Sequence, residues 1–322
     1  MKKQYGILSI PVIVAALGYF VDIYDLLLFS ITRIESLRSF GLSPEQITIE
    51  GESILIWQMA GLMIGGIVWG MMGDKKGRLS VLFGSIILYS LANIANGFVQ
   101  NTEQIRLIRF IAGLGLAGEL GAGITLVSEL VVKEKRGIAT SLVAGLGLTG
   151  AVAAFIIKEN FEWRTCYFIG GGMGLLLLAL RLSVFESGMF HEVRQMDVKR
   201  GNIWMLFNNR DRLKRYVLSI LIGLPTWFVI GVLVSFSSEF GKWMNIKEKI
   251  DPGRAIMYAY SAIAIGDIFI GFVSQWLRSR KKALYLFYVI TGIFILLFFT
   301  ILWNGTAERM YWICAGLGFG TG

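Results

Sequence analysis

The sequence predicts an all-α integral membrane protein built from two six-helix repeats, of which the second is incomplete. Of its 322 residues, 55% are hydrophobic and only 16% are charged, whereas soluble domains carry about a quarter charged residues. Apolar stretches recur along the whole chain, each close to the roughly 20 residues that a helix needs to cross hydrocarbon. Glycine-rich phrases from the first part of the chain also return in the second part. These three observations together predict the fold class.

The apolar stretches are predicted to be helices, because none alternates as a strand would and because lipid offers no partner to exposed backbone groups. The first follows the basic start MKKQYG. It contains Asp22 and Asp25 and lacks a small-residue cleavage site, so we expect a retained helix rather than a signal peptide. The last is too short for a full span, so we expect about ten of twelve helices and a truncated sequence. The predicted spans are residues 8–32, 52–72, 79–99, 107–131, 137–157, 165–185, 216–238, 255–277, 283–303 and 310–322.

The net charge of +9 reports membrane topology rather than a nucleic-acid partner. Most Lys and Arg residues fall in alternate loops, which the positive-inside rule places in the cytoplasm. The sequence therefore predicts a multi-pass protein of the inner (plasma) membrane with a cytoplasmic N-terminus. The basic clusters lie at residues 2–3, 75–78, 133–136, 194–215 and 278–282.

Two sequence alignments of the chain with itself indicate a duplication. AGLGLAG, starting at Ala112, matches AGLGFGTG, starting at Ala315, and GMMGDKKGR at Gly70 matches GFVSQWLRSRKK at Gly271. The two offsets nearly agree, as expected for a transporter built from parallel repeats. A long polar stretch separates the halves. The predicted parts are a six-helix half at 1–185, a cytoplasmic linker at 186–215 and an incomplete half at 216–322.

Four motifs in chain order resemble those of the major facilitator superfamily: GMMGDKKGR, RFIAGLGLAGELG, SELVVKEKRG and VFESGMF. The resemblance implies the two-half fold of that family and a cytoplasmic latch that breaks and reforms during transport. Opposite charges at neighbouring helix ends can pair in this way, whereas the alternative is a solvated basic turn that only sets topology. The latch residues would be Gly70, Asp74, Gly77, Arg78, Glu129 and Arg136.

Ionisable residues within the predicted spans are functional candidates, because charge is costly in a bilayer. Asp22 and Asp25 lie three apart in DIYD, on one helical face, and Glu119 lies near the middle of its span. We expect these three acids to bind protons reversibly; the alternative is that they pair with basic residues and only hold helices together. DIYD also resembles the Asp-Gly-Tyr-Asp of organic-acid/proton symporters, with Ile23 in place of glycine.

Solute-binding candidates are Tyr24, Arg109, Trp227 and Asp267. The guanidinium of Arg109 could hold a solute carboxylate through paired hydrogen bonds, or it could equally extend to the membrane interface. Trp227 follows Pro225, which should kink its helix. Two other arginines near predicted span ends, Arg33 and Arg181, are expected at or near the interface.

The function predicted from these features is secondary active transport of a small organic solute by alternating access, coupled to protons as a symport and directed inward. The alternatives are a non-transporting sensor of the same fold, a uniporter or an antiporter. We expect no enzyme, cofactor or metal, because Cys166, Cys314 and His191 form no metal or redox spacing. The sequence also has no nucleotide-binding loop. The expected partners are the solute, protons and the lipid bilayer, and the protein is expected to be a monomer.

Overall fold

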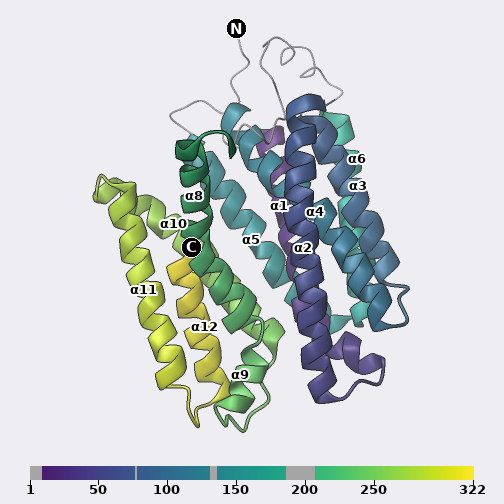
Figure 1. The fold of residues 1–322 in the computed structure, drawn as a ribbon, viewed down its shortest axis with the longest axis vertical. Helices are drawn as coiled ribbons and strands as arrows, with labels where there is room; N and C mark the ends of the chain where they lie inside the picture. The colour runs from purple at the N-terminus through teal and green to yellow at the C-terminus, as the bar shows by residue number, and fades with distance from the viewer. Residues whose placement is uncertain (1–8, 77, 131–135, 186–206) are drawn as a thin grey trace. The chain divides into compact units, whose positions relative to one another are not determined.

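The computed structural model describes residues 9–76, 78–130, 136–185 and 207–322, and every regular element in these ranges is a helix (Figure 1). Seven of the helices in the described part are long and apolar enough to cross a membrane, by length and composition. The prediction of an all-α membrane fold is thus confirmed.

The helices fall into two compact units. The first comprises Met1–Gly150 with Asn160–Met205, and the second comprises Ala151–Glu159 with Leu206–Gly322. Helices of the first unit are α1 (Ile10–Ser39), α2 (Pro44–Lys76), α3 (Arg78–Asn96), α4 (Thr102–Leu130), α5 (Arg136–Asn160, which passes into the second unit) and α6 (Trp163–Phe185). The second unit holds α8 (Arg210–Phe228), the π-helical η2 (Val229–Val234), α9 (Ser237–Trp243), α10 (Pro252–Trp276), α11 (Arg280–Thr300) and α12 (Ala307–Thr321).

Each predicted span overlaps a described helix, but the ends differ where helices continue beyond the apolar stretch. The first helix was predicted to end at residue 32, whereas α1 reaches Ser39. Likewise, α2 begins at Pro44, because Ser43 and Gln46 cap it reciprocally: the backbone N–H of each donates to the side chain of the other. Hydropathy identifies only the apolar stretch of each helix. The helical backbone hydrogen bonds continue beyond it into the polar residues at the helix ends.

The predicted seventh span, residues 216–238, is interrupted. Pro225 lies inside α8, and the chain then changes to the π-helical turns of η2 before α9 begins at Ser237. A proline removes a backbone donor and crowds the preceding turn. The chain is irregular on the C-terminal side of the proline, in η2, and the kink predicted at Pro225 itself stays a prediction.

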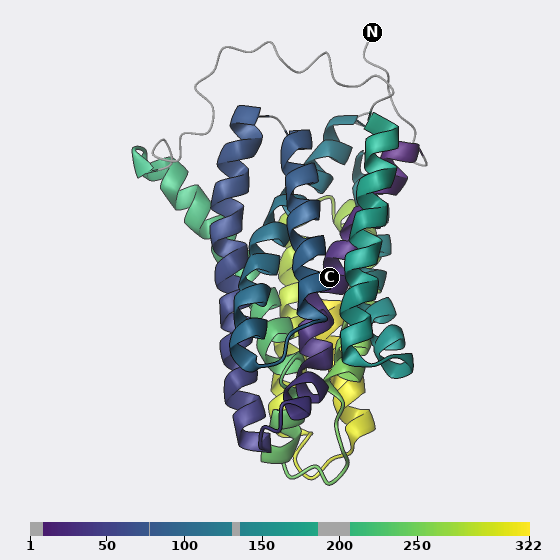
Figure 2. The same cartoon turned by 90° about the vertical axis from the view of Figure 1, so that its right-hand side faces the viewer.

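In the first unit α4 makes its most extensive contacts with α2 and α3, and the three helices run side by side (Figure 2). Glycines allow α2 and α4 to touch: a Cβ atom at Gly61 would collide with the backbone of Phe110, and one at Gly65 with that of Leu114. The indole N–H of Trp69 also donates to the carbonyl of Leu114 at 2.6 Å. Small residues at helix contacts are the usual means of close packing in membranes.

The second unit repeats this arrangement. Its most extensive helix contact joins α10 and α12. A Cβ at Gly266 on α10 would collide with the backbone of Phe319, and one at Gly318 on α12 with that of Ala259. The sequence offset that aligns Gly70 with Gly271 also aligns Gly65 with Gly266. The same helix pair therefore packs through glycine in both units, as a duplicated unit predicts.

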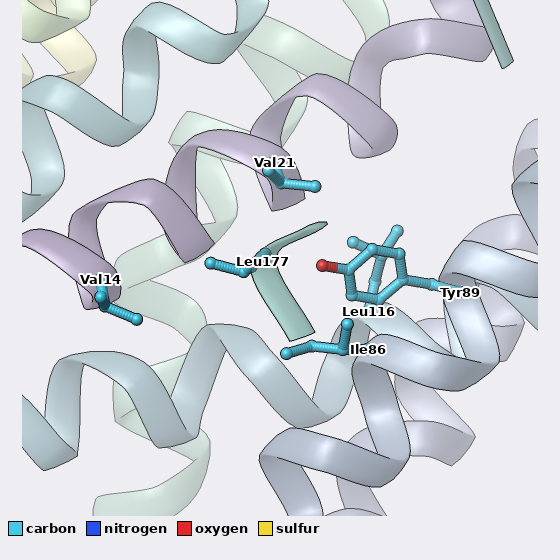
Figure 3. Close-up of a cluster of buried hydrophobic side chains, with 6 residues drawn as sticks. All are labelled: Val14, Val21, Ile86, Tyr89, Leu116 and Leu177. Atoms are coloured by element: carbon cyan, nitrogen blue, oxygen red, sulfur yellow. The ribbon is translucent and has the colours of Figure 1, made fainter. Parts of the chain in front are cut away.

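An apolar cluster joins four helices of the first unit (Figure 3). Its side chains come from α1, α3, α4 and α6, and the Tyr89 hydroxyl points toward the side of Leu177. The cluster consists of Val14, Val21, Ile86, Tyr89, Leu116 and Leu177, all buried. These same four helices carry the polar groups described below.

Replacing Gly65 by alanine should destabilise the first unit, whereas the same change at the neighbouring Gly66 should not. A Cβ at Gly65 meets the backbone of Leu114, but one at Gly66 meets nothing within 4 Å. Overpacking costs about 1–3 kcal/mol, while alanine gains about 0.5–1 kcal/mol over glycine inside a helix. Thermal unfolding in detergent should show a melting temperature several degrees lower for G65A and unchanged or higher for G66A. Equal effects would contradict the assigned α2–α4 contact.

Candidate functional site

The two acids of α1 lie in the interior of the first unit. Asp22 and Asp25 are fully buried, and their spacing of three places them on one face, about one turn apart. Because α1 is the most buried of the apolar helices, this face meets neighbouring helices rather than lipid. Any charge here must be balanced by groups on those helices.

Asp25 is balanced by Arg109 of α4, which is also fully buried. Arg109 Nη1 donates to Asp25 Oδ1 at 3.1 Å, and Nη2 donates to Asn93 Oδ1 on α3 at 2.6 Å. The guanidinium carbon lies 4.8 Å from the ring centroid of Tyr167 on α6, within cation–π range. The structure therefore supports the interior position of Arg109 over the alternative of an interfacial side chain.

The buried network also keeps unused hydrogen-bonding capacity. Arg109 Nε, Asn93 Nδ2 and Asp25 Oδ2 have no hydrogen-bond partner among the described residues. Buried polar atoms are nearly always satisfied in proteins, so each of these groups calls for a partner such as water, an ion or a polar ligand. The Arg109 fork is suited to a carboxylate, which accepts two parallel hydrogen bonds.

A second buried pair of charges joins α4 and α6. Glu119 of α4 pairs with Arg181 of α6, and both side chains are at most 3% exposed. Asp22 lies within electrostatic range of both residues and of Asp25. The three predicted proton-binding acids are therefore brought together, along with two arginines.

Two arginines are placed differently from the prediction. Arg181 and Arg33 were expected at or near the interface, yet they are 2% and 0% exposed. Arg33 packs against α2, where Gly51 leaves room for its side chain. Neither side chain extends to the surface of the bundle, because distance from a span end along the sequence does not measure burial among helices.

Tyr24 has a structural contact that the sequence did not reveal. Its hydroxyl donates to the backbone carbonyl of Cys166 at 2.8 Å, so that α1 is tied to α6. The neighbouring Tyr167 hydroxyl lies 3.3 Å from Thr32 Oγ1. A direct role of Tyr24 in solute binding stays a prediction, and its hydroxyl is already engaged.

The remaining solute candidates belong to the second unit. Trp227 is 51% exposed on α8. Asp267 is half-buried on α10 and has no ion pair among the described residues. Their roles stay predictions.

The latch also stays a prediction. Gly70 and an exposed Asp74 lie on α2, and Gly77 lies outside the described residues. Arg78, Glu129 and Arg136 lie at ends of α3, α4 and α5, where the structure describes the backbone but not their side chains.

Sequence reasoning missed Asn93 and Arg181 as members of this site, and it also missed Asn96, which is buried one turn further along α3. A signal was present for the asparagines: they lie three apart, on one helical face, in the otherwise apolar stretch SLANIAN. Amide side chains inside a membrane span are unusual enough to indicate a polar contact with a neighbouring helix.

Two curated relatives are similar to this chain. A probable 4-methylmuconolactone transporter of Cupriavidus pinatubonensis is 27% identical over 213 residues, which cover 64% of this chain and 49% of the relative. The sialic acid transporter NanX of Escherichia coli is 28% identical over 276 residues, which cover 83% of this chain and 65% of the relative. The chain thus spans about half the length of the first relative and 65% of the second.

A solved structure and a family model match almost the whole chain. The proton:xylose symporter XylE, bound to 6-bromo-6-deoxy-D-glucose, aligns with a TM-score of 0.66 and 14% identity, covering 97% of this chain and 80% of that one. Identity this low shows the fold alone. The family model described as Major Facilitator Superfamily matches residues 15–322. The chain therefore belongs to the major facilitator superfamily.

Proposed function

We propose that the protein containing this chain is a secondary active transporter that moves a small organic anion by alternating access, in symport with protons. The observation that carries the proposal is the fully buried Asp25–Arg109–Asn93 network, in which one arginine joins a carboxylate and an amide inside an apolar bundle. Such an arrangement is expensive for stability alone, because desolvating an ion pair offsets much of its Coulomb attraction. A functional reason accounts for its presence in this position.

The geometry supports a simple exchange of partners. Arg109 is held by Asp25 through one nitrogen, and its Nε has no partner among the described residues. A solute carboxylate can take the place of Asp25 on the guanidinium fork. The displaced Asp25 carboxylate is then a buried charge without a counterion, and it regains neutrality by binding a proton. Solute binding and proton binding are thereby linked.

The relatives support the substrate class. The names of the two curated relatives specify sialic acid and 4-methylmuconolactone, and both compounds carry a carboxylate. We therefore propose organic acids as substrates, inward transport, an inner-membrane location with the N-terminus in the cytoplasm, and a monomeric protein.

Trp227 and Asp267 remain proposed contributors from the second unit. The latch of the Gly70–Arg78 region with Glu129 and Arg136 is proposed to control alternation.

The direct test is solute-driven proton movement in proteoliposomes containing the protein encoded by the complete gene. Adding sialic acid, 4-methylmuconolactone or benzoate outside should make the external medium more alkaline if the solute enters with protons. Asp25→Asn should abolish this signal, because the amide cannot take up the proton. Glu45→Gln, an exposed residue on α2, is the control and should leave the signal unchanged.

Three outcomes contradict this proposal in different ways. Solute uptake without alkalinisation indicates a uniporter, and acidification indicates an antiporter. Saturable solute binding without any uptake indicates a sensor of the same fold.

Arg109→Lys should weaken solute binding although the positive charge is kept. Lysine lacks the planar fork, so at least one charge-assisted hydrogen bond of about 1.5–3 kcal/mol is lost. The solute concentration for half-maximal uptake should therefore rise about 10- to 100-fold. Arg106→Lys is the matched control, because Arg106 lies one turn away on α4 and pairs with the partly exposed Glu50 and the exposed Glu103. Similar effects in both variants would remove Arg109 from the solute site.

A further inference from the structure

The charges around Asp22 do not balance. Glu119 is neutralised by its ion pair with Arg181, and Asp25 by its ion pair with Arg109. Asp22 is fully buried, and neither of its carboxylate oxygens has a hydrogen-bond partner among the described residues. Three buried acids therefore face two arginines. The excess negative charge falls on Asp22.

The charged and titratable groups around Asp22, among the side chains that the structure describes, come from four helices. They are Asp25 on its own helix, Glu119 on α4 and Arg181 on α6, and Tyr89 on α3 lies in range of the same charges. Only Arg181 is positive, and its Nη2 is already engaged by Glu119. A second carboxylate sharing one guanidinium in an apolar surrounding is unfavourable as an anion, and binding one proton removes that charge.

The local sequence makes room for this arrangement. Gly18 lies one turn before Asp22 on α1, and a Cβ atom there would collide with the Arg181 guanidinium and the Glu119 carboxylate. The glycine allows the ion pair to press against α1, next to Asp22. The Glu119–Arg181 ion pair therefore packs against the same face of α1 that carries Asp22 and Asp25.

We propose that Asp22, Glu119 and Arg181 form a proton site distinct from the Asp25–Arg109 pair, in which Asp22 carries the proton and exchanges it with Asp25. This inference rests on the proposed symport and names its proton path. When a solute takes Arg109, the O–H bond of the Asp22 carboxylic acid breaks and a new O–H bond forms on the Asp25 carboxylate. Asp22 is left as a carboxylate beside Arg181, and a proton from the aqueous phase restores it.

Asp22→Asn should uncouple the two fluxes in the proteoliposome assay. The ratio of protons to solute taken up should fall at least about tenfold, because asparagine cannot relay a proton. A purely structural role for Asp22 would lower both fluxes together and leave the ratio unchanged, which would overturn the proposal. Asp22→Glu, which keeps the carboxyl group, should restore the ratio in part.

Infrared difference spectroscopy of the purified protein tests the site without any solute. At neutral pH the C=O band of a protonated carboxylic acid should be present in the wild type, lost in Asp22→Asn and kept in Asp25→Asn. Glu119→Gln provides an independent variant, since it frees Arg181 to neutralise Asp22. That variant should also lose the band, although Asp22 is still present. Glu45→Gln should keep it.

The two tests separate this inference from the proposed function. If the wild type moves no protons with any of the three solutes but shows the Asp22 band, the symport proposal fails and the proton site stands. A band that persists in Asp22→Asn or in Glu119→Gln would refute the proton site, whatever the transport assay shows.

Discussion

The arrangement of the first unit depends on the neutralisation of one buried guanidinium. Arg109 contacts Asp25 of α1, Asn93 of α3 and the ring of Tyr167 on α6, while its own backbone belongs to α4. A single side chain thereby links four helices, and removing either charge would leave the other unpaired in an apolar interior at a cost of about 3–5 kcal/mol. The apolar cluster in Figure 3 joins the same four helices. The apolar contacts and the buried charge network therefore hold the same four helices together.

That coupling explains which parts of the structure could be predicted from the sequence. Hydropathy along the chain located the long apolar helices of the described residues, because each span must satisfy its own backbone in lipid, but it gave no sign of the separate short α9 (Ser237–Trp243). It located helix ends less well: α1 continues to Ser39, so Arg33 lies inside the helix rather than at its edge. The sequence also identified Asp22, Asp25 and Glu119, each by itself, as acids inside predicted membrane spans. Periodicity within one helix contains no information about which residue of another helix faces it.

Arg181 shows this limit most clearly. Its position near the end of its span suggested an interfacial side chain, but Glu119 on α4 holds it in the interior. Gly18 of α1 leaves room for the pair, so that three helices meet at this contact. Tyr24 shows the converse, since a residue expected to face a solute donates its hydroxyl to a backbone carbonyl of α6. Side-chain roles of this kind follow from tertiary packing.

The internal repeat separates the requirements of packing from those of chemistry. Glycine contacts are present in both units, with Gly65 and Gly266 at equivalent positions of α2 and α10. The offset that aligns Ala112 with Ala315 instead places Trp312 opposite Arg109, and Gly322 opposite Glu119. Close helix contact is needed wherever two membrane helices meet, so the duplication keeps it. A buried charge is costly and has to be balanced by groups on neighbouring helices, and in the described residues the buried acids and arginines all lie in the first unit.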